Sequence, residues 1–199
     1  MSVSLGLLLL VFFGLIALTA VPLGRVMARV FAGEAHSTGR VLGPIERLIH
    51  RAAGVDAARE HTWKEYALAM LAFSVLTQLV THVILRAQAA LPGNPTHLPG
   101  VAPWLAFNTA TSFTTNTNWQ SYAGEATMSY LSQAVALTSH NFFSAGVGIC
   151  IAIALIRGIS RAETDKLGNF WVDLVRVHLY VLLPRSSTAA ISAWRRSTS

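Results

Sequence analysis

Three long runs of apolar residues lie along the chain, at about residues 3–23, 66–91 and 131–156. A helix needs roughly 20 apolar residues to cross the hydrocarbon core of a bilayer, so each run is long enough to span a membrane. A fourth run begins near Leu174 and stops at Pro184, which is too short to cross. The pattern predicts an all-α membrane protein with three transmembrane helices and an incomplete fourth span.

The first run, within residues 1–23, differs from a cleaved signal peptide. No basic side chain precedes it, and it is longer than the apolar core of about 7–15 residues that secretory signals contain. Arg25 and Arg29 follow it directly. We therefore expect an uncleaved helix whose N-terminus lies outside the cell.

Basic residues are concentrated between the apolar runs and orient them. Residues 24–65 form a mixed-charge loop, in which residues 44–49 have apolar positions at helical spacing and predict a short helix at the membrane surface. Residues 157–184, after the third run, are also rich in arginine and lysine. Because cytoplasmic loops carry such an excess, the expected topology along the chain is out, in, out, in.

The composition agrees with this picture. Charged residues make up 12% of the chain, against about 25% in soluble domains, and 53% of the residues are hydrophobic. The net charge of +6 does not indicate nucleic-acid binding, because the basic residues lie in loops beside the apolar runs. Cys150 is the single cysteine and lies within an apolar run, so we expect a small core residue rather than a disulfide.

Two of the runs carry polar positions at helical spacing. In the second run these positions include Gln78 and Thr81, and in the third they include Asn141, Ser144 and Gly148. Polar groups inside a bilayer face protein or water, and small residues four apart let helices approach closely. Both helices should therefore pack against other helices, with Ser144 and Gly148 at a close contact.

The segment between the second and third runs contains a second type of element. Pro103 suits the first turn of a helix, and the helix would contain about 12 residues before the pattern changes. Such a helix is about 18 Å long, too short to cross a bilayer. We interpret it as a re-entrant half-helix.

An uncharged stretch rich in hydroxyl and amide groups follows, from Thr114 to Tyr122. At membrane depth such a stretch is tolerated only where it lines water or is buried in protein. Carbonyl oxygens of an extended loop replace the hydration shell of a monovalent cation, and the carbonyl end of the half-helix also favours positive charge. Residues 66–156 therefore have the arrangement of a potassium-channel pore unit: span, half-helix, filter loop, span.

These residues carry a specific resemblance. Residues 108–113 (Asn-Thr-Ala-Thr-Ser-Phe) and 115–125 (Thr-Asn-Thr-Asn-Trp-Gln-Ser-Tyr-Ala-Gly-Glu) resemble the first filter loop of the potassium-binding subunit family of the bacterial Kdp potassium-transporting P-type ATPase. Supporting matches occur at residues 22–24, 46–47, 63–66, 98–100 and 167–174. The resemblance extends from about Leu5 to Pro184.

The resemblance implies a role for this loop and a set of partners. The residues implied at the K+ filter are Thr115, Asn116, Thr117, Asn118 and Gln120, with Gln120 at the outer part. Family members contain four pore units and work with an ATP-hydrolysing P-type ATPase subunit, a small single-span subunit and a periplasm-facing subunit. The chain would then be a non-catalytic, K+-binding subunit in the bacterial plasma membrane, with ATP used only by its partner.

The family pattern is expected to end at Pro184. Residues 185–199 are polar and basic where family members continue with apolar residues. A frameshift or a misread gene end would produce this change, and a natural short variant with a basic tail is the alternative. With one of the four filter loops, we do not expect this chain alone to form a selective pathway, so a non-functional remnant is also considered.

Two further function classes remain open. A pore unit of an ATP-independent K+ transporter of the same superfamily would be favoured by a glycine-centred filter, and residues 115–120 contain no glycine. A membrane-embedded enzyme would need paired carboxylates or clustered histidines inside the spans, and the apolar runs contain neither. The seven histidines are scattered without the spacing of a known zinc motif.

Overall fold

The computed structural model describes residues 3–34, 39–161 and 164–184. Its elements in chain order are α1 (Val3–Ala32), α2 (Gly39–Ala52), β1 (His61–Thr62), α3 (Trp63–Ala87), α4 (Pro103–Thr114), α5 (Gly124–Thr127), the π-helical η1 (Ser132–Thr138), α6 (Ser139–Ser160), β2 (Lys166–Gly168), α7 (Phe170–Arg176) and the π-helical η2 (Val177–Leu182). The tail expected at residues 185–199 lies outside the described residues.

Three helices are long and apolar enough to cross a membrane, at Leu5–Ala32, Trp63–Ala87 and Ser132–Ser160. They confirm the three predicted spans. The first helix extends past the predicted residue 23, because the residues that follow remain good helix formers as far as Ala32. Gly33 ends it at a φ of 74°, with Gly33 N donating to Val30 O and Glu34 N to Arg29 O, the paired bonds of a Schellman motif.

The start of α3 is fixed by a capping box. The hydroxyl of Thr62 accepts from the backbone N–H of Glu65, and the Glu65 carboxylate accepts from the backbone N–H of Thr62. This cap starts the helix at Trp63, before the first residue of the predicted run. The preceding strand β1 pairs antiparallel with β2, His61 opposite Gly168 and Thr62 opposite Lys166.

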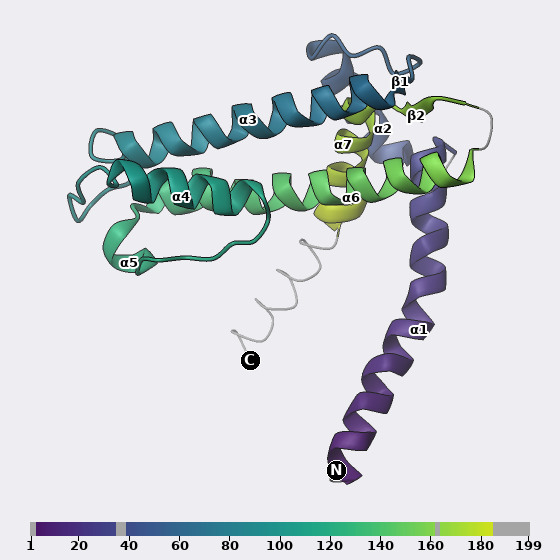
Figure 1. The fold of residues 1–199 in the computed structure, drawn as a ribbon, viewed down its shortest axis with the longest axis horizontal. Coiled ribbons are helices and arrows are strands. Elements are labelled where there is room, and N and C mark those ends of the chain that lie inside the picture. The colour runs from purple at the N-terminus through teal and green to yellow at the C-terminus, as the bar shows by residue number, and fades with distance from the viewer. Residues whose placement is uncertain (1–2, 35–38, 162–163, 185–199) are drawn as a thin grey trace.

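Helices α3, α4 and α6 lie side by side, while α1 extends away from them (Figure 1). η1 leads directly into α6, so the two form one continuous span. One apolar cluster joins α3, α6 and α7 around Phe170, and it includes Cys150, which is fully buried as expected. A second joins α3 and α4 to the segment after α5 through Leu85, Phe113 and Met128.

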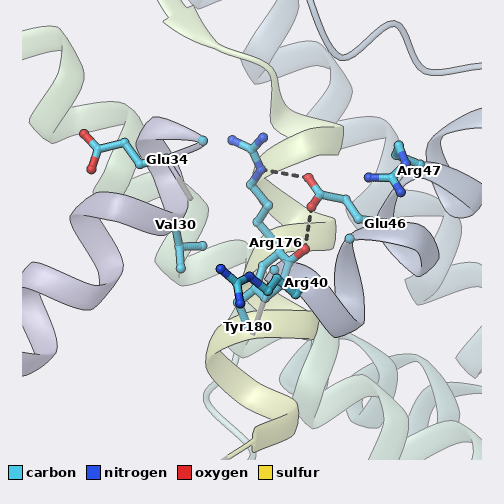
Figure 2. A pocket seen from close by; sticks show the side chains of 10 residues that line it. Val30, Glu34, Arg40, Glu46, Arg47, Arg176 and Tyr180 are labelled. Atoms are coloured by element: carbon cyan, nitrogen blue, oxygen red, sulfur yellow. Dashed lines mark hydrogen bonds and ion pairs between the residues drawn. The ribbon is translucent and has the colours of Figure 1, made fainter. Parts of the chain in front are cut away.

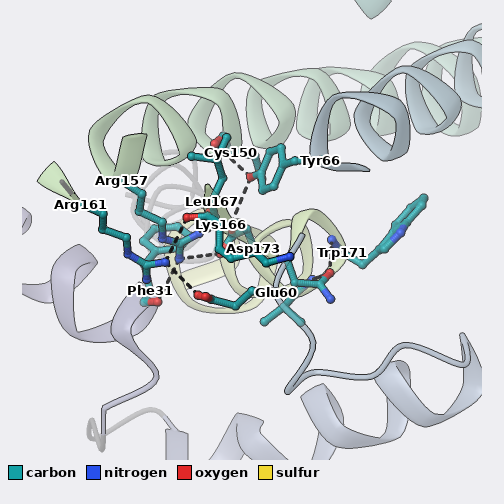
Figure 3. Close-up of polar contacts among 12 residues, drawn as sticks. Phe31, Glu60, Tyr66, Cys150, Arg157, Arg161, Lys166, Leu167, Trp171 and Asp173 are labelled. Atoms are coloured by element: carbon teal, nitrogen blue, oxygen red, sulfur yellow. Dashed lines mark hydrogen bonds and ion pairs between the residues drawn. The ribbon is translucent and has the colours of Figure 1, made fainter. Parts of the chain in front are cut away.

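A buried ion pair connects α6 to α7. Arg157 donates to both oxygens of Asp173 and also to the carbonyls of Leu167 and Phe31, at distances of 2.6 to 3.1 Å (Figure 3). The hydroxyl of Tyr66 on α3 lies 3.1 Å from Asp173 Oδ2. This junction therefore ties together the last residues of α1 and the ends of α3, α6 and α7 that lie on the same side of the molecule.

A second polar junction holds α2 against η2. Glu46 accepts from Arg176 at 2.9 Å and from the hydroxyl of Tyr180 at 2.6 Å (Figure 2). Burial by itself would raise the pKa of Glu46, but the hydrogen bonds from Tyr180 and Arg176 outweigh it and hold the pKa below its ordinary value. Burial and the Glu46 contact raise the pKa of Tyr180 to about 12, so the phenol keeps its proton and remains a donor.

The close helix contact expected at Gly148 is found instead at Gly146, two residues earlier in α6. Gly148 is exposed, and a Cβ atom built on it would meet nothing within 4 Å. Gly146 is buried instead, and a Cβ atom there would overlap the imidazole of His178. The prediction was therefore wrong for Gly148, because the partner of α6 in this region is the α7–η2 segment, which approaches from the side of Gly146.

Candidate functional site

The helix predicted after Pro103 is present as α4, with Pro103 at its first position. It contacts both α3 and α6 and runs beside only part of their length, and the chain then returns toward the end of the bundle from which α4 started (Figure 1). Gln78 on α3 donates to the hydroxyl of Thr111 at 2.9 Å. The polar face expected on the second span thus contacts the short helix.

The polar loop after α4 turns through two left-handed residues. Asn116 has a φ of 58° and Asn118 a φ of 54°. Asparagine adopts this region more readily than most side chains, whereas β-branched residues such as threonine strongly disfavour it. The alternation of Thr and Asn from Thr115 to Asn118 therefore matches an alternation of backbone conformation, with asparagine at the two positions that require it.

Ser112, in the last turn of α4, is hydrogen-bonded to the loop. Its carbonyl oxygen accepts from the backbone N–H of Thr117 at 3.1 Å and of Asn118 at 3.2 Å. Its hydroxyl donates to the carbonyl of Trp119 at 2.9 Å, and the residue is 1% exposed. The sequence interpretation expected an extended loop. The loop is instead folded back on the carbonyl end of α4.

Thr115, Asn116, Thr117 and Asn118 present four successive backbone carbonyls in this loop. Within the described part of the chain, none of these four oxygens accepts a hydrogen bond. All four residues are exposed, as is Gln120. The residues that the resemblance pointed to therefore form an exposed polar strip, interrupted by Trp119, in which Thr115–Asn118 offer backbone oxygens and Gln120 offers a side-chain amide.

Two residues of α6, His140 and Ser144, contact the chain at the start of this strip. His140 Nε2 lies 3.1 Å from the hydroxyl of Thr114, the last residue of α4. Ser144 Oγ lies 3.2 Å from Asn116 Oδ1 and 2.9 Å from the carbonyl of His140, and its one proton serves one of these acceptors at a time. Ser144 was expected at a helix contact, and Ser112 lies in the string 108–113 that carried the resemblance, whereas His140 carried no signal in the sequence beyond its polarity within an apolar run.

The electrostatics of the loop come from dipoles rather than from charged side chains. Residues 92–124 contain no Asp, Glu, Lys or Arg. The carbonyl end of α4 and the peptide oxygens after it therefore give the site a partial negative character, which suits a weakly held cation.

Comparison with known proteins identifies the family. The family described as the potassium-transporting ATPase A subunit matches residues 10–194, which extends past Pro184, where the resemblance was expected to end. The potassium-transporting ATPase potassium-binding subunit of Rhodospirillum centenum is 56% identical over 187 residues, or 94% of this chain and 33% of that protein. The subunit of the same name from Pseudomonas aeruginosa is 54% identical over 178 residues, or 89% of this chain and 32% of that protein.

The chain thus spans about a third of the length of the curated relatives that it matches. The match covers the loop, the helices around it and the two polar junctions, since all of them lie within residues 10–194. The chain belongs to the family of the potassium-transporting ATPase A subunit.

Proposed function

We propose that Thr115, Asn116, Thr117, Asn118 and Gln120 contribute oxygen ligands to the K+ filter of the potassium-binding subunit of an ATP-driven importer. The observation that carries this proposal is the strip of four backbone carbonyls, from Thr115 to Asn118, that lack a hydrogen-bond donor within the described residues. These four residues are exposed, so their carbonyls are accessible to a cation, and carbonyl oxygens can replace the hydration shell of K+.

The position of the strip supports the same function. α4 has 12 residues and is therefore about 18 Å long, against about 30 Å for the hydrocarbon core. If α4 enters from one surface of the bilayer, its carbonyl end and the loop lie near mid-membrane. A re-entrant helix of this kind places the negative end of its dipole beside the ion. The chain after the loop then returns to the surface from which α4 entered, and the space along it is a water-filled entrance.

The backbone conformation of the strip also suits a row of oxygens. In a regular strand, successive peptide groups point to opposite sides. Left-handed residues at Asn116 and Asn118 break that alternation. Peptide dipoles without a nearby carboxylate bind K+ strongly enough to replace water and weakly enough to release it. The exposed amide of Gln120 would then act at the outer part of the filter and tune affinity.

A selective filter requires a ring of oxygens, and this chain supplies one loop of it. By the resemblance, the other loops belong to the remaining two thirds of the longer family members. In that setting K+ is the transported ion, and ATP is hydrolysed by a P-type ATPase partner, alongside a small single-span subunit and a periplasm-facing subunit. The N-terminus would lie outside the bacterial plasma membrane.

A chimera tests this function. Residues 1–184 of this chain replace the matched third of the Rhodospirillum centenum relative, in a host whose growth at micromolar K+ depends on that transporter. Asn118→Gly keeps the left-handed conformation accessible, whereas Asn118→Val disfavours it. We expect the chimera and N118G to support growth and K+ uptake and N118V to lose both at normal expression. Equal uptake by N118V and N118G would contradict the proposal.

A further inference from the structure

His140 occupies a buried position between two hydroxyl groups. Its Nδ1 lies 2.7 Å from the hydroxyl of Thr81 on α3, and its Nε2 lies 3.1 Å from the hydroxyl of Thr114 at the end of α4. The residue is 2% exposed, and among the described residues no acidic side chain pairs with the ring. The imidazole therefore connects α3, α4 and α6 directly behind the loop.

The neighbouring hydrogen bonds determine which ring nitrogen carries the proton. The hydroxyl of Thr114 donates its proton to the carbonyl of Ala110 at 2.8 Å, so its oxygen is an acceptor toward His140. Nε2 of His140 is then the donor, and in a neutral ring Nδ1 is the acceptor for the Thr81 hydroxyl. The reverse arrangement would leave the Thr81 proton without an acceptor in the described part of the chain.

The same turn of α6 reaches the loop at a second point. The carbonyl of His140 and the Oδ1 of Asn116 both lie within hydrogen-bond distance of Ser144 Oγ. Thr114 ends α4, and Asn116 is the first left-handed residue of the loop. His140 and Ser144 therefore contact the residues on both sides of Thr115. Thr115 carries the first of the four backbone carbonyls that accept no hydrogen bond within the described residues.

We propose that His140 is a positioning residue for the filter loop, which acts as the neutral Nε2–H tautomer through Thr114. Thr81 fixes the ring by donating to Nδ1, and Nε2–H fixes the end of α4 and with it the direction of the following carbonyls. The effect on K+ rests on the proposed function of the loop, whereas the tautomer and its effect on loop order do not.

Two substitutions separate the two sides of the ring. The side-chain amide of glutamine reaches about as far as Nε2 and can donate to Thr114, whereas that of asparagine reaches only as far as Nδ1 and can accept from Thr81. His140→Gln therefore keeps the contact with the loop, and His140→Asn keeps only the contact with α3. Both variants bury one amide in place of the imidazole, so each is the matched control of the other.

The first experiment uses the 199-residue chain in lipid nanodiscs without K+. Nitrogen-15 chemical shifts of labelled histidine, assigned to His140 by difference with H140Q, are expected to show protonated Nε2 and unprotonated Nδ1. Hydrogen exchange over residues 112–122 is expected to be unchanged in H140Q and about tenfold faster in H140N, the ratio that about 1.4 kcal/mol produces. An Nδ1–H ring, or equal exchange in the two variants, would overturn the proposal.

The second experiment measures K+ uptake in the chimera described above. H140N is expected to raise the half-saturating K+ concentration about tenfold with little change in maximal rate, and H140Q to restore the unmodified value within about twofold. If the unmodified chimera does not transport K+, the proposed function fails while the exchange and tautomer results still decide the role of His140. If it does transport and the two variants have the same K+ dependence, the positioning role is refuted.

Discussion

Arg157 and Asp173 form a two-point ion pair between α6 and α7, with nitrogen–oxygen distances of 2.6 and 3.0 Å. Their side chains are 14% and 2% exposed. Gly168 is part of this arrangement, since its φ of 95° and the guanidinium packed against it leave no room for a side chain. The pair is the main polar contact that holds the short α7 segment to the spanning helices.

Removing one partner of this pair should be strongly destabilising. Among the described residues, Arg157→Met would leave Tyr66 as the one remaining side-chain hydrogen-bond partner of the buried Asp173 carboxylate, and such a loss costs about 3–5 kcal/mol. We expect the unfolding free energy in detergent, measured by denaturant titration, to fall by that amount. Arg161→Met removes an exposed pair with Glu60 and should cost less than about 1 kcal/mol. Equal losses in the two variants would show that burial of the pair is unimportant.

The packing of α6 against η2 gives a prediction at Gly146. Alanine there would overlap the ring of His178, whose Nδ1 lies 2.7 Å from the carbonyl oxygen of Leu174 and whose Nε2 lies 3.1 Å from that of Phe142. A neutral ring donates to one of these two carbonyls. Overpacking of this kind costs about 1–3 kcal/mol, so Gly146→Ala should lower the thermal midpoint. Gly148→Ala is the matched control, because it faces open space and gains helix propensity. A lower midpoint for G148A than for G146A would contradict the observed packing.

The spans and the short helix are predictable from the sequence because each depends on a local property. Apolar length defines a membrane helix, and Pro103 followed by 11 helical residues defines α4. That the helix ends in a loop is also predictable, because the run of Thr and Asn after it is poor in helix formers, whereas the return of this loop onto Ser112 was not predicted. These features require no knowledge of which helices are neighbours.

The contacts between helices are not predictable in this way. Arg157 reads in the sequence as one of several basic residues that follow a span, and only the folded chain brings Asp173 to it. His140 is one of seven scattered histidines until α3 and α4 place Thr81 and Thr114 on its two sides. The choice of Gly146 over Gly148 likewise depends on the side from which His178 approaches.

The Glu46 junction predicts a pH dependence for α2. The pKa of Glu46 is lowered in the folded chain from its ordinary value of 4.5, so the unfolded state binds the proton more tightly. The stabilisation is therefore complete above pH 4.5 and is lost as the pH falls through the lowered folded value. We expect amides of residues 39–52 to lose protection from hydrogen exchange, corrected for intrinsic rates, as the pH is lowered from 6 to 3.

Glu46→Gln should reduce this dependence to the part that comes from His50, a buried histidine of α2 whose pKa burial lowers and which therefore also titrates as the pH falls. Glu60→Gln is the control, because Glu60 is about half exposed and pairs with Arg161, which lies far from α2 in the chain. It should leave the loss of protection unchanged. A pH response of the same size in E46Q would mean that another group controls the docking of α2.

The hydrogen bond from Ser112 to Trp119 predicts how firmly the loop is held on α4. Ser112→Ala removes the donor to the Trp119 carbonyl but keeps the backbone carbonyl that accepts from Thr117 and Asn118. Loss of one bond worth about 1 kcal/mol should speed exchange of those two amides about fivefold, without K+ present. Ser121→Ala, at an exposed position of the same loop, should leave the rates unchanged. If S121A has as large an effect as S112A, the loop responds to any loss of a hydroxyl group, and its order does not come from the end of α4.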